Sequence, residues 1–217
     1  MRSDDEIRTN VEAELRWCPE IDETDIAVKV KEGVVTLTGF VGRLPEKYRA
    51  EAVIKRVVGV AAVANDIEVQ PPPGEGSTDP EIAREAVAAL KNELPWCWQN
   101  IQPLVHQGRV ALEGTVEWNW QRESAEQVMH QLPGVVSVRN SIRIEPHARP
   151  TDIKRKIEAA FHRNARIDAN NVSVEARGAE VTLRGTVRSW AERDEARRAA
   201  WSAPGVTRVQ DEIVVRT

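Results

Sequence analysis

The sequence of 217 residues contains only two cysteines, one tyrosine and two phenylalanines, and it has no long apolar run. Cys18 and Cys97 can form one disulfide at most, so the chain is not a disulfide scaffold, and we expect both thiols to be reduced. The most apolar stretch, residues 57–64, is far shorter than the roughly 20 residues that cross a bilayer. No transmembrane segment is predicted, and the apolar content of 41% favours a soluble globular protein.

An excess of positive charge is also absent, since the formal net charge is −4. Proteins that bind nucleic acid usually carry a basic excess, so nucleic acid is not an expected partner. The N-terminal residues enter a helical pattern directly, without the apolar segment and cleavage site of an export signal. We therefore predict a cytoplasmic location, with a periplasmic location as the alternative if the native N-terminus differs.

Motifs that mark catalytic or metal sites are missing as well. The sequence has no glycine-rich loop of the dinucleotide-binding or phosphate-binding type and no G-x-S-x-G motif. The four histidines do not stand at metal-ligand spacing: His106, His130, His147 and His162. We therefore predict no catalytic residue, no metal and no cofactor, and we do not expect an enzyme.

One unit is repeated three times along the chain. The stretch G-V-V-T-L-T-G-F-V at 33–41 returns as G-R-V-A-L-E-G-T-V at 108–116, and its last seven positions return as V-T-L-R-G-T-V at 181–187. A Gly-Val pair follows in every copy, always with its glycine 20 residues after the glycine of the strand pattern. Such regular spacing indicates tandem domains. The signature glycines are Gly39 and Gly59, Gly114 and Gly134, and Gly185 and Gly205.

Periodicity within one copy predicts the order of its elements. In the first copy, residues 7–15 and 50–57 carry apolar side chains at helical spacing. Residues 26–41 alternate with period two around a glycine turn, as in a hairpin, and 63–69 form a last strand. The predicted fold class is α+β: three tandem α-β-β-α-β domains, each with two helices packed on one face of a three-stranded mixed sheet. The predicted domains are 3–70, 78–145 and 149–217, with linkers at 71–77 and 146–148.

The repeated unit resembles the BON domain, named for bacterial OsmY and nodulation proteins. The resemblance lies in the V-x-L-x-G-x-V strand, in a helical alanine (Ala50, Ala125 and Ala196), and in the motif G-V-x-x-V-x-[ND]. It covers nearly the whole chain. It implies a stress-associated, non-catalytic protein that contacts anionic phospholipid surfaces or another amphipathic ligand. Some BON-containing relatives bind potassium, but no potassium ligand set is identifiable in this sequence.

Two sets of polar residues recur in all copies. Asn65, Asn140 and Asp211 interrupt an apolar alternation, and we interpret them as short side chains that satisfy backbone donors rather than as a site. A polar pair opens the second helix of each copy, and we interpret these residues as solvated. The pairs are Glu46-Lys47, Gln121-Arg122 and Glu192-Arg193.

The copies differ most in their tryptophans. In the second copy, Trp96 and Trp98 precede the first strand, and Trp118 and Trp120 follow the second strand. Because these two strands are antiparallel, we expect all four rings to lie at one end of the sheet. They form either a contact between domains or an exposed apolar patch that binds a ligand.

The third copy alone has more basic than acidic residues, and Lys154, Arg155 and Lys156 lie together on its first helix. They are either a solvated helix face with local ion pairs or a patch that an anionic surface attracts. With the four tryptophans they are the candidate ligand contacts. We predict a non-catalytic protein that binds anionic phospholipid or another amphipathic ligand. The alternatives are a cytoplasmic protein-interaction scaffold and a potassium sensor, and the sequence leaves the oligomeric state open.

Overall fold

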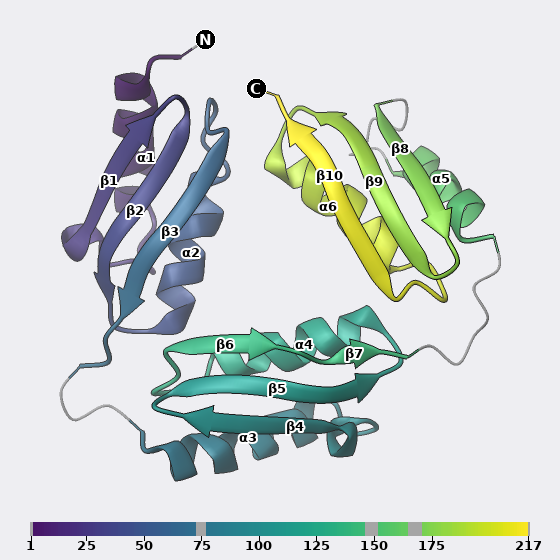
Figure 1. Cartoon of the computed structure of the whole chain (residues 1–217). Helices are drawn as coiled ribbons and strands as arrows, with labels where there is room; N and C mark the ends of the chain where they lie inside the picture. Colours follow the sequence, from purple (N-terminus) through teal and green to yellow (C-terminus); the bar gives the residue numbers. More distant parts are fainter. Residues whose placement is uncertain (1, 73–76, 146–151, 165–170, 217) are drawn as a thin grey trace. The chain divides into compact units, whose positions relative to one another are not determined.

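Three domains of one architecture follow each other along the chain in the computed structural model, which describes residues 2–72, 77–145, 152–164 and 171–216 (Figure 1). Each repeats the order helix, strand, strand, helix, strand, so the predicted α+β fold class is confirmed. The predicted linker at 146–148, and part of the linker at 71–77, lie outside the described residues.

The first domain begins with a helix whose start the sequence encodes directly. The Ser3 N–H donates to the Glu6 carboxylate over 2.9 Å, and the Glu6 N–H donates to the Ser3 hydroxyl over 3.3 Å. This reciprocal capping satisfies two helix donors that would otherwise lack partners. The elements are α1 (Asp4–Trp17), a 3₁₀ turn η1 (Glu23–Asp25), β1 (Ile26–Lys31), β2 (Val34–Val41), α2 (Leu44–Ile54) and β3 (Ala62–Val69).

The sheet of the first domain has β2 in its centre, antiparallel to β1 and parallel to β3. Both helices lie behind this sheet in Figure 1 and cover one of its faces. The side chains of that face and of the helices form a single core. Its most completely buried members are Ile7, Val11, Leu15, Val35, Leu37, Ala50, Ile54, Val60 and Ile67.

The second domain differs from the expected pattern in its last strand. The predicted single strand is divided into two short pieces, and both of them pair in parallel with the central strand β5. The division falls at Ser141 and Ile142, where Ser141 still donates its N–H to the Leu112 carbonyl over 2.8 Å. The elements are α3 (Asp79–Glu93), η2 (Trp98–Asn100), β4 (Ile101–His106), β5 (Arg109–Val116), α4 (Asn119–His130), β6 (Ser137–Asn140) and β7 (Arg143–Ile144).

The third domain fills the same core with different side chains. Its second helix buries only small residues, Ala196 and Ala200, while the ring of Phe161 is buried where the first domain has Leu15. A larger ring on one helix therefore accompanies smaller residues on the other, as close packing requires. The elements are α5 (Ile153–Arg163), β8 (Val172–Arg177), β9 (Glu180–Val187), α6 (Trp190–Trp201) and β10 (Arg208–Val215).

The strand glycine has a steric role in the first and third domains. Gly39 and Gly185 are each the sixth residue of the central strand and have φ angles of +124° and +145°. A Cβ atom on Gly39 would collide with the carbonyl oxygen of Asp25, and one on Gly185 with that of Asn171. Glycine is required because the first strand begins in contact with this backbone.

Candidate functional site

Trp96 projects from a tight turn that follows α3. Leu94 is fully buried, and its carbonyl accepts the N–H groups of Cys97 (3.1 Å) and Trp98 (2.9 Å). These bonds anchor the turn to the core, while the Trp96 side chain remains 87% exposed. The Trp98 ring is half-buried, with the Lys91 ammonium 4.7 Å from its centroid. The turn therefore presents one exposed indole on a hydrogen-bonded support.

The second pair of tryptophans lies between β5 and α4. Trp118 is half-buried, and its N–H donates to the Gln121 side chain over 2.9 Å. Trp120, in the first turn of α4, is 51% exposed. None of the four candidate tryptophans is fully buried. Their convergence at one end of the sheet stays a prediction.

Asn119, between these two tryptophans, is a residue that sequence reasoning missed. Its side chain is buried, and its Oδ1 atom has no hydrogen-bond partner among the described residues. The corresponding position of the first copy is Leu44, a core residue. Comparison of the copies would have revealed it, because here a polar residue stands in place of an apolar one.

Trp17 is a second residue that sequence reasoning did not select. It ends α1, outside the stripe of Ile7, Val11 and Leu15, and its side chain is 85% exposed. The exposure of Trp17 could have been predicted from its position outside the apolar stripe of the helix. The following turn and strand start are acidic, with Glu20, Asp22, Glu23 and Asp25. Trp17 therefore lies near acidic side chains, which an anionic surface repels.

The three basic candidates of the third domain project from α5 into solvent, because Ile153 and Ile157 occupy its buried face. Lys154 forms an ion pair with Glu158 at 3.7 Å, and Arg155 forms one with Asp152 at 3.0 Å. Among the described residues, Lys156 has no such pair. Exposed pairs of this kind contribute about 0–1 kcal/mol, so they hold the two charges only weakly.

The recurring polar position joins the last strand to the second helix of each domain. Asn65 donates from Nδ2 to the Lys47 carbonyl over 3.0 Å, and its Oδ1 accepts the Ile67 N–H over 3.4 Å. In the third domain, Asp211 accepts the Ile213 N–H over 3.0 Å. The interpretation that this residue accepts backbone N–H groups therefore agrees with the geometry. In addition, its side chain contacts the second helix.

The polar pairs that open the second helices are not merely solvated, contrary to expectation. Lys47 donates from Nζ to the Ile67 carbonyl over 2.6 Å, and Arg193 forms an ion pair with Asp211 at 2.9 Å. The preceding acid accepts a backbone N–H at the helix entrance, as Glu192 does from Arg188 over 2.9 Å. The long side chains reach the neighbouring strand, which a helix pattern alone does not reveal.

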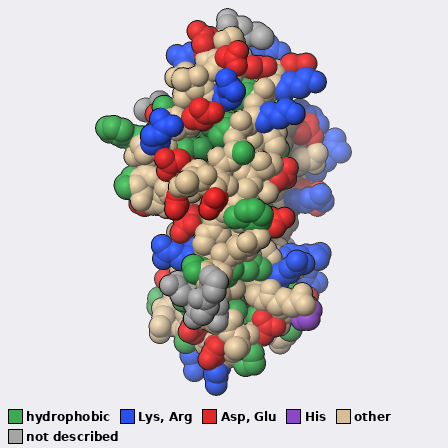
Figure 2. Space-filling view, turned by 90° about the vertical axis from the view of Figure 1, so that its left-hand side faces the viewer, with side chains coloured by type: hydrophobic (Ala, Val, Ile, Leu, Met, Phe, Trp, Pro, Cys, Tyr) green, Lys and Arg blue, Asp and Glu red, His purple; other side chains and the backbone are tan. Residues whose placement is uncertain are grey.

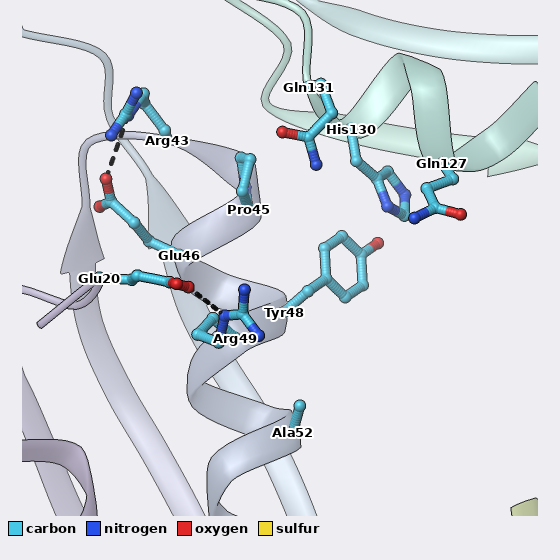
Figure 3. A pocket seen from close by; sticks show the side chains of 10 residues that line it. All are labelled: Glu20, Arg43, Pro45, Glu46, Tyr48, Arg49, Ala52, Gln127, His130 and Gln131. Atoms are coloured by element: carbon cyan, nitrogen blue, oxygen red, sulfur yellow. Dashed lines mark hydrogen bonds and ion pairs between the residues drawn. The ribbon is translucent and has the colours of Figure 1, made fainter. Parts of the chain in front are cut away.

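A pocket of about 500 Å³ lies beside α2 (Figure 3). The rings of Tyr48 and His130 stack there, with centroids 4.3 Å apart and planes at 19°. Burial lowers the pKa of His130, whose Nε2 has no hydrogen-bond partner among the described residues. The neighbouring charges form ion pairs with each other, Arg49 with Glu20 and Arg43 with Glu46. This arrangement offers no nucleophile with an adjacent base.

Other reactive groups are sparse. Cys18 and Cys97 are half-buried free thiols, and burial raises the pKa of Cys97. The described part of the chain contains no group of three or more His, Cys, Asp or Glu side chains that could hold a metal ion. None of its helices is long and apolar enough to cross a membrane. Hydrophobic side chains do reach the surface between charged ones on the face that Figure 2 presents.

Comparison with known proteins identifies the repeated unit. The family model described as BON domain matches residues 3–71, 78–146 and 150–217. Osmotically-inducible protein Y of Escherichia coli (strain K12) is 32% identical over 145 residues, which cover 64% of this chain and 72% of that protein.

Matches to solved structures are much weaker. The structure of CdsD, a structural protein of the type III secretion system of Chlamydia trachomatis, is 12% identical with a TM-score of 0.27, over 97% of this chain and 92% of that one. The PrgH periplasmic domain is 12% identical with a TM-score of 0.24, over 96% and 100%.

Proposed function

Because the chain belongs to the BON domain family, we propose that it is a stress-associated, non-catalytic binding protein that docks on anionic phospholipid surfaces. The name of its osmotically inducible relative supports the association with stress. The observation that carries the proposal is Trp96, an indole 87% exposed on a turn that is anchored to a buried leucine.

An exposed indole on a fixed turn suits an interfacial role. Trp is enriched at membrane–water interfaces, where its apolar body and its N–H group meet different surroundings. Removing apolar surface from water gains roughly 25 cal/mol per Å², and little conformational entropy is lost because the turn is already ordered. Trp120, 51% exposed, is the second candidate of this kind.

Basic residues on α5 supply the preference for anionic lipid. A Lys or Arg near an anionic membrane gains about 1 kcal/mol, and salt weakens this attraction because the screening length is about 8 Å at physiological ionic strength. Lys154, Arg155 and Lys156 are all exposed, and the two that form ion pairs have only exposed, local partners. Their charges are therefore available to a surface.

Co-sedimentation of the full chain with vesicles tests the proposal. We expect binding to vesicles that contain phosphatidylglycerol, and little binding to pure phosphatidylcholine. Trp96→Ala should weaken binding about tenfold at every salt concentration. Trp17→Ala is its matched control, since Trp17 is 85% exposed but precedes acidic residues, and it should leave binding unchanged.

The electrostatic part has its own variant pair. Lys154→Glu with Lys156→Glu should weaken binding at low salt, and the loss should shrink as salt rises. Arg197→Glu with Arg198→Glu changes the net charge equally on α6 of the same domain and should have a smaller effect. Absence of vesicle binding in the wild type would refute the proposal and favour the protein-interaction scaffold. The cytoplasmic location expected from the sequence stays a prediction.

A further inference from the structure

The first domain has a sheet face that its own helices do not cover. The alternation along β2 directs Val35 and Leu37 into the core, so the residues between them lie on the other face. This open face carries, along β2, Val34, Thr36, Thr38 and Phe40. Phe40 is 46% exposed and Val34 is 39% exposed. The centre of the open face is therefore partly apolar and has no charged side chain.

The other two copies carry charges at the same strand positions. Where β2 has Val34 and Thr38, β5 has Arg109 and Glu113, and β9 has Glu180 and Arg184. In the third domain Arg184 forms ion pairs with Glu175 on β8 at 3.0 Å and with Glu212 on β10 at 2.6 Å. In that sheet the charge on the central strand is therefore paired by charges on both outer strands. The uncharged centre distinguishes the first domain.

Charges on the open face of the first domain are separated to opposite edges. Lys29 and Lys31 lie on β1, and Asp66 and Glu68 lie on β3. The register places Lys31 beside Val34 at one end of the face, and Glu68 beside Phe40 at the other. All four charged side chains are exposed, and none forms an ion pair within the described residues. A basic corner and an acidic corner thus lie diagonally across an uncharged centre.

We propose that two copies of this chain associate face to face through the open sheet faces of their first domains. A two-fold axis requires a self-complementary patch, in which residue i of one copy meets residue j of the other and the reverse. An axis between the sheets and oblique to the strands brings the basic corner of each copy over the acidic corner of its partner. The strands then cross at an angle, as in orthogonal sheet packing.

The size of the face sets the strength of this association. Three strands of up to eight residues cover roughly 14 by 26 Å, from their spacing of about 4.8 Å and rise of about 3.3 Å per residue. The area of a face with these dimensions is less than the ~800 Å² per partner that stable complexes bury. The dimer is therefore reversible and concentration-dependent. Part of its affinity is Coulombic, so salt weakens it.

Analytical ultracentrifugation of the full chain, without lipid, tests the inference through a charge exchange. The wild type should dimerise as its concentration rises from roughly 1 to 500 µM. One variant combines Lys29→Glu with Lys31→Glu, and the other combines Asp66→Lys with Glu68→Lys. Each alone should dimerise about tenfold more weakly or worse, because like charges then meet across the axis.

The decisive sample is the equimolar mixture of the two variants. One copy then presents two acidic corners and the other two basic corners, so a heterodimer should form at least as tightly as the wild-type dimer. Arg197→Glu with Arg198→Glu, on α6, makes the same net-charge change as the variant at Lys29 and Lys31 and should leave association unchanged. A wild type that stays monomeric, or a mixture of folded variants that stays monomeric, overturns the inference. Neither result bears on vesicle binding, which uses other residues.

Discussion

Asn119 is unusual among the buried residues because its side chain is polar, and within the described residues its carbonyl oxygen has no hydrogen-bond partner. Such a group costs about 1–3 kcal/mol when it lacks a partner. The first domain has Leu44 at this position, 2% exposed, so the fold accommodates leucine there. We therefore predict that Asn119→Leu stabilises the second domain by about 1–3 kcal/mol.

Urea denaturation followed by tryptophan fluorescence measures this change, since Trp118 and Trp120 flank the site. Leu44→Asn is the reciprocal control and should destabilise the first domain by a similar or larger amount. A lower urea midpoint for Asn119→Leu would mean that the amide makes a favourable interaction in solution.

The burial of individual side chains was predictable where it follows from the spacing of apolar residues along a helix. Ile7, Val11 and Leu15 are buried as their helical periodicity indicates. The different exposures of Trp96 and Trp98 were not predictable, since both belong to one Trp-x-Trp motif. Their difference arises from hydrogen bonds to Leu94, which direct one ring outward and leave the other beside Lys91.

At the scale of elements, an acidic residue ties the first helix of a domain to its hairpin. The Asp79 carboxylate, at the start of α3, accepts the N–H groups of Gln107 and Gly108, each over 2.8 Å. Asp4 makes the same pair of bonds with Glu32 and Gly33 in the first domain. Bonds from these backbone groups lower the pKa of Asp79 below its ordinary value of 3.8.

A lowered pKa in the folded state gives the stability a definite pH dependence. The ionised Asp79 stabilises the fold above its unfolded pKa, and this contribution is lost as the pH falls through the folded value. Asp79→Asn should therefore lower the melting temperature at pH 7. The difference from wild type should close as the pH falls below 3.8.

Asp5→Asn is the matched control, because Asp5 lies in the first turn of α1 without a bond to the hairpin and should have a smaller effect. Differential scanning calorimetry at several pH values supplies the data. A gap between wild type and Asp79→Asn that persists unchanged at pH 2.5 would contradict this role for the carboxylate.

The order of elements was predictable because each repeat changes from a helical period to an alternating one at the same places. The division of the last strand into β6 and β7 was not, since its apolar alternation matches that of β3 and β10. Whether a strand continues depends on hydrogen bonds to its neighbour. The contacts of Lys47 and Arg193 with the last strand were not predictable either, because that strand lies about 20 residues away in the sequence.

At the scale of the whole molecule, the three copies share a fold and differ in what they expose. The second carries four of the seven tryptophans, the third has a basic first helix, and the first has an open sheet face with an uncharged centre. The first two differences are visible in composition. The open sheet face of the first domain could not be predicted without the strand register, because the same residues would be buried if they faced the helices.

On the function proposed above, the indole of Trp96 enters the interface of an anionic membrane. Quenching of tryptophan fluorescence by phosphatidylglycerol vesicles with brominated acyl chains tests it most directly, because quenching requires the ring to approach the bromine atoms. We expect quenching of the wild type and of Trp17→Leu, and a large loss of quenching in Trp96→Leu. Equal quenching of Trp96→Leu and wild type, or no quenching of the wild type, would contradict it.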